Sequence, residues 1–321
     1  MENNEKSIVN ELMEKIKAEM KKVIVEQEEL IDFSLINLIC GGHVLLEGVP
    51  GLAKTLMVKA LAGALSVDFK RIQFTPDLMP ADITGTKIFD MKTREFELKK
   101  GPIFTNLLLA DEINRTPPKT QAGLLEAMAE RTVSIDGEML QLSSLFMVFA
   151  TQNPLEYEGT YPLPEALTDR FQMKIIIDYP TAGAEKEVLR RHNEGILAAD
   201  PELPAIRAVC EPQDIMKCRE EVQKVRVDNA LMEYMVKIVQ ETRNHPMIDI
   251  GSSPRGSIAL LQCSKAFAAF GGRDFIIPED VKKMAVPTLR HRLILKPELE
   301  LEGIKPEQVL TDILSKIKVP R

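Results

Sequence analysis

The stretch at residues 44–55 constrains this chain more than any other. A short apolar run there breaks into a Gly-rich loop, and the loop ends at Lys54 and Thr55. The apolar run is typical of a buried parallel strand, and the spacing of apolar residues from Lys54 onward predicts a helix. The loop therefore joins a strand to a helix N-terminus, where backbone N–H groups without helical partners favour an anion. This arrangement predicts a phosphate-binding loop.

We expect the whole loop to bind a polyphosphate. Its residues are Gly48, Val49, Pro50, Gly51, Leu52, Ala53, Lys54, Thr55 and Leu56. Lys54 would reach the terminal phosphates, and the Thr55 hydroxyl would bind Mg²⁺. The usual pattern Gly-x-x-x-x-Gly-Lys-Ser/Thr is met except at its second Gly, which is Ala53 here. We expect Ala53 to have right-handed helical dihedrals, which alanine adopts readily. The alternative is a Gly-Pro turn followed by a surface lysine.

Two further apolar runs end on polar residues. Residues 107–112 end on Asp111 and Glu112, and Asn153 follows the run at 145–150. In doubly wound sheets such strand ends lie beside the phosphate loop. We expect Asp111 to hold Mg²⁺ through water and Glu112 to orient and deprotonate the attacking water. Asn153 can cap a turn, or it can hydrogen-bond the attacking water or the terminal phosphate. For an isolated Asp-Glu pair, a solvated strand end is the alternative.

Two arginines are candidates for a role at the nucleotide. Arg170 lies at the end of a short helix predicted over residues 163–171, and it can form a surface ion pair with Asp169 or reach the nucleotide of a neighbouring subunit. Arg255 stands in the first turn of a helix that Ser253 caps, near the positive end of the helix dipole. A bound anion or solvent would have to compensate the charge of Arg255.

Composition excludes several classes of protein. A net charge of -7 argues against a surface that binds nucleic acid throughout. The cysteines form no Cys-x-x-Cys pair and the histidines have no ligand spacing, so we expect reduced thiols and no protein-built zinc site. The chain begins without a signal peptide, and its longest uncharged run, residues 33–46, is too short to span a bilayer. We therefore expect a soluble cytoplasmic protein.

The pattern of elements predicts a two-part organisation. Residues 1–180 contain an N-terminal amphipathic helix and an α/β nucleotide-binding domain, residues 181–204 form a connector with several prolines, and residues 205–321 form an all-helical domain. Two hairpins are predicted within the α/β domain, around residues 91–94 and 136–138. The apolar face of the N-terminal helix is expected to consist of Ile8, Leu12, Ile16 and Met20.

Five stretches, taken in order, resemble the MoxR family of AAA+ ATPases. They are residues 48–55, 110–115, 150–154, 159–171 and 253–255, and the resemblance covers nearly the whole chain. Ala53 resembles the usual form of the family at that position. The resemblance implies an α/β fold of αβα type with a parallel sheet in the order 5-1-4-3-2, followed by an all-α lid. It also implies assembly into a ring, which we expect to be a hexamer.

The same resemblance implies roles for single residues. Lys54 and Thr55 match the Walker A pair, Asp111 and Glu112 the Walker B pair, and Asn153 the first sensor. Arg170 matches the arginine finger and Arg255 the second sensor.

The chain departs from the family at one position, and the resemblance also implies a class of partner. This chain has Glu26 where the family has Gly, in a loop expected to border the adenine. Asn114 and Arg115 match the family motif without a physical role. The partners that the family implies are von Willebrand factor A domain proteins, as clients of a chaperone-like role in maturing complexes or inserting cofactors.

Three functions follow from these patterns. The first is a Mg-dependent ATPase that hydrolyses ATP across subunit interfaces of a ring and remodels a protein client. The second is a nucleic-acid-stimulated motor or loader, although 5% aromatic residues and no Trp offer few stacking platforms. The third is a slow nucleotide-dependent switch or scaffold, which only Ala53 and Glu26 support. A small-molecule kinase is disfavoured, because a long helical lid and a paired Asp-Glu strand end suit water activation better.

Overall fold

A five-stranded parallel sheet forms the centre of the α/β part of the molecule. The computed structural model describes residues 7–154, 159–195 and 206–320. The strands lie in the order β2-β5-β8-β1-β9, and all neighbours are parallel. Counted along the chain this is the order 5-1-4-3-2, which confirms the prediction. The strands are β1 (His43–Glu47), β2 (Phe69–Gln73), β5 (Leu107–Asp111), β8 (Met147–Gln152) and β9 (Phe171–Ile176).

Both faces of this sheet are covered, which explains why its central strands β1, β5 and β8 are almost wholly apolar and buried. On β5, Leu107 and Leu109 belong to one hydrophobic core, whereas Leu108 and Ala110 belong to another. Successive side chains of a strand point to opposite faces, so each strand supplies both cores. The first core contains α1 (Ile8–Met20), α2 (Glu28–Cys40) and α3 (Lys54–Leu65); the second contains α4 (Pro80–Thr84), α5 (Pro118–Glu130) and α6 (Glu165–Thr168).

The buried face of α1 differs from the prediction. Ile8 is 62% exposed, and the buried residues are Val9, Met13, Ile16 and Met20. A strict spacing of four residues drifts around an α-helix by about 40° at each step, because 3.6 residues make a turn. The spacing 9, 13, 16, 20 follows the true period and therefore stays on one face.

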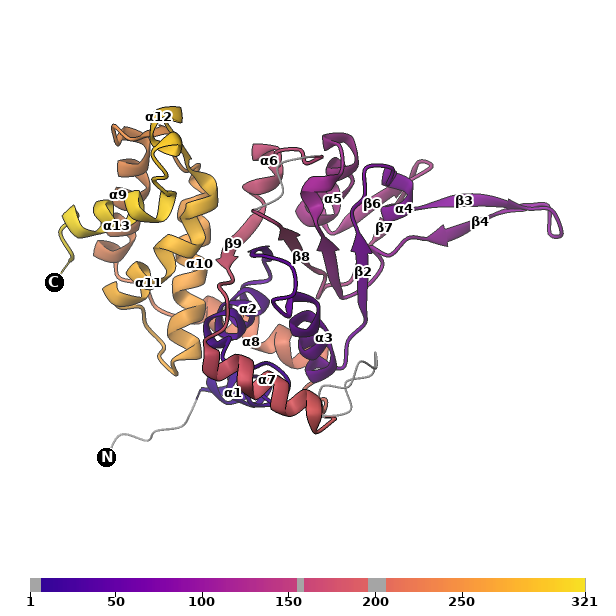
Figure 1. The fold of residues 1–321 in the computed structure, drawn as a ribbon, viewed down its shortest axis with the longest axis horizontal. Helices are drawn as coiled ribbons and strands as arrows, with labels where there is room; N and C mark the ends of the chain where they lie inside the picture. The colour runs from indigo at the N-terminus through magenta and orange to yellow at the C-terminus, as the bar shows by residue number, and fades with distance from the viewer. Residues whose placement is uncertain (1–6, 155–158, 196–205, 321) are drawn as a thin grey trace.

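Two antiparallel hairpins interrupt the α/β pattern, as predicted. The first consists of β3 (Gly85–Asp90) and β4 (Glu95–Lys100), and it projects far from the body of the molecule (Figure 1). The second consists of β6 (Thr132–Ile135) and β7 (Glu138–Gln141). Each hairpin turn contains a residue with positive φ, Arg94 in the first and Asp136 in the second.

The segment before β9 corrects another expectation. A helix was predicted over residues 163–171, but α6 spans only Glu165–Thr168 and β9 begins at Phe171. Pro164 keeps Leu163 out of the helical region, because the residue before a proline favours extended backbone. At the other end Phe171 pairs with His43 of β1, which takes the chain into the sheet.

The C-terminal part is mostly helical, and it shares a core with the sheet. Helices α8 and α10 both pack against α2, and residues of α10, α11 and α13 belong to the same hydrophobic core as α1 to α3. Its elements are α8 (Pro212–Lys224), α9 (Asn229–Asn244), β10 (Ile248–Ile250), α10 (Pro254–Phe270), α11 (Pro278–Leu289), η2 (Arg290–Arg292), β11 (Ile294–Leu295), α12 (Pro297–Leu301) and α13 (Pro306–Lys316).

The described part of the expected connector contains a helix. This helix is α7 (Ala182–Asn193), whose N-cap Thr181 accepts a hydrogen bond from the N–H of Ala184. Residues 196–204 of the connector and residues 1–6 of the expected first domain lie outside the described residues. The domain boundaries stay a prediction. Within the described ranges, no helix is both long enough and apolar enough to cross a membrane.

Candidate functional site

The phosphate loop connects β1 to α3, as predicted, and its glycines have distinct reasons to be there. A Cβ at Gly48 would lie 2.7 Å from the backbone oxygen of Ile177, so no larger residue fits against β9. Gly51 has φ +87°, a conformation that glycine adopts without strain. The loop can therefore pass close to the sheet and turn sharply before α3 begins.

Ala53 does not have the right-handed dihedrals that we expected. Its φ is 56° and its ψ is 20°, which is the left-handed region, and it is the N-cap of α3. The loop geometry thus keeps the conformation that the second Gly of the usual pattern would supply. An L-residue pays about 1–2 kcal/mol for this conformation, so the surrounding structure must hold the backbone there.

The loop presents unpaired donors and one lysine to the space in front of it. Among the hydrogen bonds of the described chain, none engages the backbone N–H groups of residues 51–55; the first helical bond runs from Met57 N–H to Ala53 O. Lys54 Nζ donates to the Gly48 carbonyl. Burial lowers the pKa of Lys54, and the charges of Asp111, Glu112 and Glu47 oppose that shift. A row of free N–H groups beside a cation is an anion-binding surface.

The two acids at the end of β5 are held by neighbouring strands. Asp111 Oδ1 accepts a hydrogen bond from Thr151 Oγ1 at 2.5 Å, and Oδ2 accepts two from Arg71, at 3.0 and 2.6 Å. Glu112 has φ 55°, which turns its side chain away from the strand direction. Its Oε2 accepts from Gln73 Nε2 at 2.7 Å and pairs with Arg115 Nε at 2.9 Å.

Sequence reasoning missed the side chains that hold these acids. Arg71 and Gln73 lie on β2, where Gln73 is in register with Asp111, and Thr151 lies on β8. The alternation of charged and apolar residues along β2 was the available signal. Residues two apart on a strand point to the same face of the sheet, so Arg71 and Gln73 lie on one face. The strand order then places β2 next to β5. Arg115, to which no role had been given, holds Glu112.

Ten of the predicted site residues line one cavity of about 410 Å³, and five of these were given a catalytic or metal-binding role. Lys54 and Thr55 come from the start of α3, Asp111 and Glu112 from the end of β5, and Asn153 from the end of β8. Asn153 is 6% exposed. The remaining lining residues are Pro50, Gly51, Leu52, Ala53, Leu56, Arg71 and Thr151.

A second, larger cavity adjoins the first and is mostly apolar. It measures about 580 Å³ and shares the loop residues 50–53 and Leu56 with the first cavity. Its other walls are the segment before α2 and one side of α7, namely Val23, Ile24, Val25, Gln27, Tyr179, Pro180, Glu185, Val188 and Leu189. An apolar cavity beside a phosphate loop has the character of a site for a planar base. The loop that contains Glu26 was expected to border the adenine, and its residues Val25 and Gln27 line this cavity.

Glu26 keeps the backbone geometry that a glycine would give. Its φ is 56°, again in the left-handed region. Its carboxylate accepts a hydrogen bond from Thr181 Oγ1 at 2.5 Å, which ties the segment before α2 to the start of α7. Glu26 therefore has a backbone conformation that glycine also adopts, and its side chain contacts the N-cap of α7.

Arg170 and Arg255 lie at the N-terminal end of the strands, whereas Lys54 lies at their C-terminal end. Arg170 directly precedes Phe171, which pairs with His43 at the start of β1, whereas the phosphate loop follows the end of that strand. A five-residue strand separates the two edges by roughly 13 Å. Arg255 Nη1 lies 3.6 Å from Asp169 Oδ2, so the anion that compensates its position at the helix end is the Asp169 carboxylate. Neither arginine lines either of the two cavities beside the phosphate loop.

The oxygen atoms at the first cavity fit Mg²⁺ bound together with phosphates. Across residues 7–154, 159–195 and 206–320, no group of three or more His, Cys, Asp or Glu could hold a metal ion alone. Mg²⁺ at nucleotide sites takes few protein ligands and completes its shell with phosphate oxygens and water. The Thr55 hydroxyl and the Asp111 carboxylate are ligands of that kind.

Comparisons with known proteins agree with this geometry. The profile of the ATPase family associated with various cellular activities (AAA) matches residues 43–173, and that of the AAA lid domain matches residues 240–313. The uncharacterized protein YeaC of Bacillus subtilis is 48% identical over 309 residues, which cover 96% of this chain and 95% of YeaC. Chaperone MoxR1 of Mycobacterium tuberculosis is 41% identical over 312 residues, covering 94% of this chain and 81% of MoxR1.

A solved structure extends the match to three dimensions. The crystal structure of a candidate ATPase from Cytophaga hutchinsonii superposes with a TM-score of 0.89 at 42% identity, and the match covers 98% of this chain and 96% of that one. At this identity and coverage the likeness concerns the whole chain rather than the sheet alone. The chain belongs to the MoxR family of AAA+ ATPases.

Proposed function

We propose that this protein hydrolyses ATP in a Mg-dependent reaction, with each active site completed by a neighbouring subunit of a ring. The observation that carries this proposal is the shared cavity of Lys54, Thr55, Asp111, Glu112 and Asn153. A phosphate loop with its lysine faces two strand-end acids there, and this is the arrangement that phosphoryl transfer to water requires.

Each residue around the cavity has a distinct task. The N–H groups of residues 51–55 and Lys54 bind the phosphates, and Lys54 leaves the Gly48 carbonyl to do so. Thr55 and Asp111 would hold Mg²⁺, which neutralises charge on the phosphate oxygens when bound. Glu112 accepts the proton of the attacking water, and Asn153 orients that water or the terminal phosphate. The adenine enters the apolar cavity between α7 and the segment before α2.

The remaining charge stabilisation comes from a second copy of the chain. Arg170 precedes β9 at the end of the strands remote from its own Lys54, and Arg255 pairs with Asp169, the residue directly before Arg170. An arginine finger supplied by a neighbour stabilises the charge that develops on the transferred phosphoryl group. In a head-to-tail ring, the edge that carries Arg170 faces the nucleotide cavity of the next subunit. Six subunits are the number that the family resemblance implies.

The client of this ring is proposed to be a protein. The chaperone name of a relative 41% identical supports a role in remodelling or maturing protein complexes. A von Willebrand factor A domain protein on a separate chain is the partner class that we expect, and the cytoplasm is the expected location. The projecting hairpin β3–β4 exposes Met91 and Phe96, which are 87% and 70% exposed, so it offers apolar contacts to a client.

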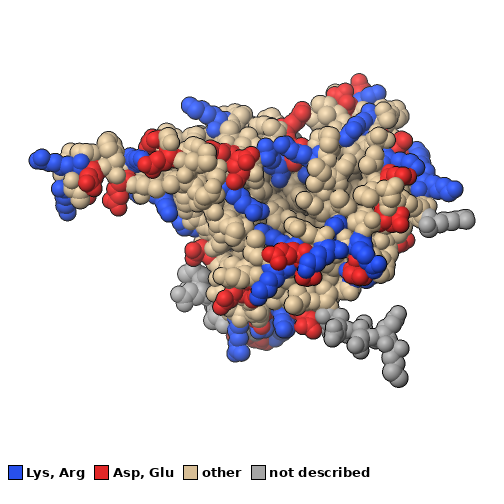
Figure 2. Space-filling model, turned by 180° about the vertical axis from the view of Figure 1, so that it is seen from behind, with Lys and Arg blue, Asp and Glu red and all other residues tan. Residues whose placement is uncertain are grey.

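Two alternatives are separated by simple assays. On the face in Figure 2, Lys and Arg side chains lie among Asp and Glu side chains, also on the hairpin, which disfavours a nucleic-acid motor. Salt-sensitive stimulation of hydrolysis by DNA or RNA would favour that motor instead. A slow switch has one observation behind it, because Gln73 and Arg115 both hold Glu112 Oε2. Turnover measured with and without ring assembly distinguishes the switch from the ATPase.

Substitutions of the two main groups test the chemistry. Glu112→Gln should bind ATP normally and lower kcat by about 100-fold or more, because the amide cannot accept the proton. Lys54→Ala should weaken ATP binding by at least about tenfold, because it removes the cation that meets the phosphates. Titration calorimetry measures binding, and phosphate release measures turnover. Glu241→Gln, an exposed position on α9, is the control. Normal hydrolysis by Glu112→Gln would refute the assignment of the base.

A further inference from the structure

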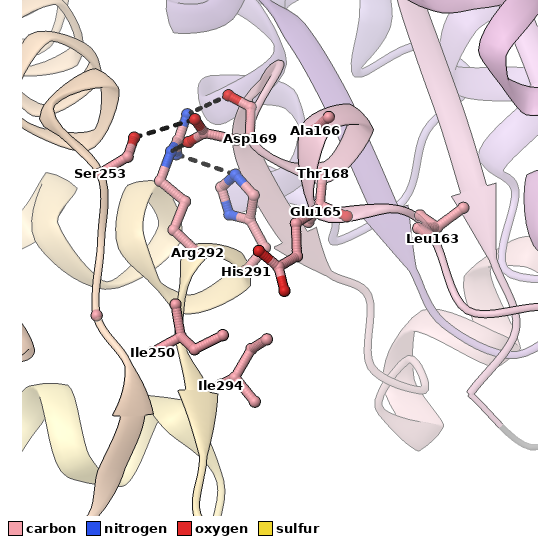
Figure 3. Close-up of a pocket in the computed structure, with 11 residues that line it drawn as sticks. Leu163, Glu165, Ala166, Thr168, Asp169, Ile250, Ser253, His291, Arg292 and Ile294 are labelled. Carbon is pink, nitrogen blue, oxygen red and sulfur yellow. Dashed lines mark hydrogen bonds and ion pairs between the residues drawn. The ribbon is translucent and has the colours of Figure 1, made fainter.

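One carboxylate collects side chains from two separate segments of the helical part. Asp169, the C-cap of α6, accepts from Arg292 Nε at 3.0 Å through Oδ1 and from Ser253 Oγ at 3.0 Å through Oδ2 (Figure 3). Arg255 Nη1 lies 3.6 Å from the same Oδ2. Ser253 caps α10, whereas Arg292 ends η2 after α11. Asp169 is therefore the point at which both segments meet the α/β part.

Arg292 also holds the backbone on both sides of Arg170. Its Nη2 donates to the carbonyl of Phe171 at 2.7 Å, and its Nη1 donates to the carbonyl of Gln172 at 3.3 Å and to that of Thr288. His291 Nε2 lies 2.8 Å from the same Phe171 oxygen. The Arg292 side chain is only 3% exposed. It is thus too deeply buried to contact a nucleotide bound by another subunit.

Arg170 depends on this anchored backbone for its position. In the described structure its buried Nε has no hydrogen-bond partner, so this atom does not orient the side chain. Asp169 on one side and Phe171 on the other are both fixed by Arg292. A cavity of about 370 Å³ lies beside these contacts, between α6 and the strands β10 and β11 (Figure 3). Because this space is not filled by packed side chains, polar contacts hold Asp169 to the helical part.

We propose that Arg292 and Asp169 are positioning residues for Arg170 and Arg255. Asp169 holds the start of α10, with Arg255, beside the backbone of Arg170, and Arg292 ties the segment 169–172 to the helical part. A change in the position of the helical part then moves both arginines together, away from or toward the nucleotide of the next subunit. This inference rests on the proposed function, in which those arginines act on a neighbour.

The test compares two Arg–Asp pairs of the full-length protein, each with one partner that is at most 3% exposed. Arg292→Met should leave the Kd for ATP and the KM within about twofold and lower kcat at least tenfold, because binding does not use the displaced arginines. Arg273→Met is the matched control. It removes the pair with Asp280, whose bonds of 2.6 and 2.7 Å lie within the helical part, and Asp280 is 1% exposed. It should leave kcat unchanged at a temperature where both variants are folded.

Further variants keep the proposal testable if Arg292→Met does not fold. Arg292→Lys retains the charge beside Asp169 but loses the hydrogen bonds of the guanidinium to several carbonyl oxygens. Its kcat should therefore lie between that of the unchanged protein and that of Arg292→Met. Asp169→Asn removes the charge without changing the shape, and its kcat should fall with an unchanged Kd for ATP. An unchanged kcat in Asp169→Asn, or an equal loss of kcat in Arg273→Met and Arg292→Met, would overturn the positioning role.

Arg170→Ala separates this inference from the proposed function. If Arg170→Ala keeps full activity, the shared active site itself is wrong. If Arg170→Ala loses activity but Arg292→Met does not, only the positioning role fails. The double variant Arg170→Ala/Arg292→Met should have a kcat only slightly below that of Arg170→Ala alone, because both changes act on one group.

Hydrogen exchange gives an independent readout. Arg292→Met should speed the exchange of amides 170–173 and leave residues 51–55 unchanged, whereas equal protection of amides 170–173 in both proteins would contradict the anchoring.

Discussion

Three residues around the two adjoining cavities have left-handed backbone although none is glycine. Glu26, Ala53 and Glu112 have φ values of 56°, 56° and 55°. Such a conformation costs of the order of 1 kcal/mol for each residue, and it persists where the surroundings hold the chain. The hydrogen bonds of Thr181 to Glu26 and of Gln73 to Glu112 are such restraints. The strain is therefore located where ATP is proposed to bind.

Replacement of Ala53 by glycine tests this strain directly. Glycine adopts φ near +56° freely, so Ala53→Gly should raise the free energy of unfolding by up to about 1 kcal/mol. Ala60→Gly is the control, because Ala60 is fully buried within α3 and glycine there should destabilise by about 1 kcal/mol. Urea denaturation of both variants gives the comparison. A loss of stability in Ala53→Gly as large as that in Ala60→Gly would show that the loop is unstrained.

At the scale of elements, α7 has a role that its sequence did not reveal. It falls within the segment predicted as a connector, and its residues Glu185, Val188 and Leu189 line the apolar cavity next to the phosphate loop. Arg191 donates to the carbonyl of Lys22 at 2.7 Å, which fastens α7 to the end of α1. The wall of the proposed adenine site is therefore built from two segments about 160 residues apart in the chain.

A charge placed on α7 should weaken nucleotide binding. Val188→Asp puts a carboxylate into the apolar cavity, and we expect the Kd for ATP to rise about tenfold, since a group that loses water there has no partner. Val236→Asp on α9 is the matched control, because the exposed fractions of the two valines are 39% and 44%. Fluorescence titration with a labelled nucleotide measures both. Equal affinities of the two variants would place the adenine elsewhere.

The elements differ in how far the sequence could predict them. The buried strands were predictable because parallel strands covered on both faces are apolar throughout, as β5 is from Leu107 to Ala110. The position of Asp111 and Glu112 was predictable because the end of a strand of a parallel sheet lies beside the loop that follows a neighbouring strand. The partners Arg71 and Gln73 were not identified, since only the register of β2 with β5 brings them to Asp111 and Glu112. The dihedral angles of Ala53 could not be predicted from the sequence either, because the path of the chain between β1 and α3 determines them.

At the scale of the whole molecule, two buried histidines link stability to pH. Burial lowers the pKa of His43 to about 4, and burial together with the charge of Arg292 lowers that of His291 well below its ordinary value of 6.5. Both are thus neutral in the folded protein at pH values where an unfolded chain binds the proton. The contribution of these two histidines to the free energy of unfolding is therefore fully present above pH 6.5. It is lost as the pH falls from 6.5 toward 4.

The slope of that loss is the measurable quantity. Each such histidine contributes about 1.4 kcal/mol per pH unit in this window. His43→Asn should give a shallower decline of the free energy of unfolding between pH 6.5 and 5 than the unchanged protein, whatever its stability at pH 7. Urea denaturation at several pH values gives the two slopes. Identical slopes would mean that His43 does not titrate differently in the folded and unfolded states.

The most direct test of the shared active site mixes two inactive variants. Lys54→Ala lacks its own phosphate lysine but carries Arg170, whereas Arg170→Ala has an intact phosphate loop but no finger. Each should be nearly inactive alone. Co-assembled in equal amounts, they should recover about a quarter of the normal ATPase rate, because that share of interfaces joins an intact loop to an intact Arg170. Activity that stays at the average of the two separate variants at every mixing ratio would contradict the account.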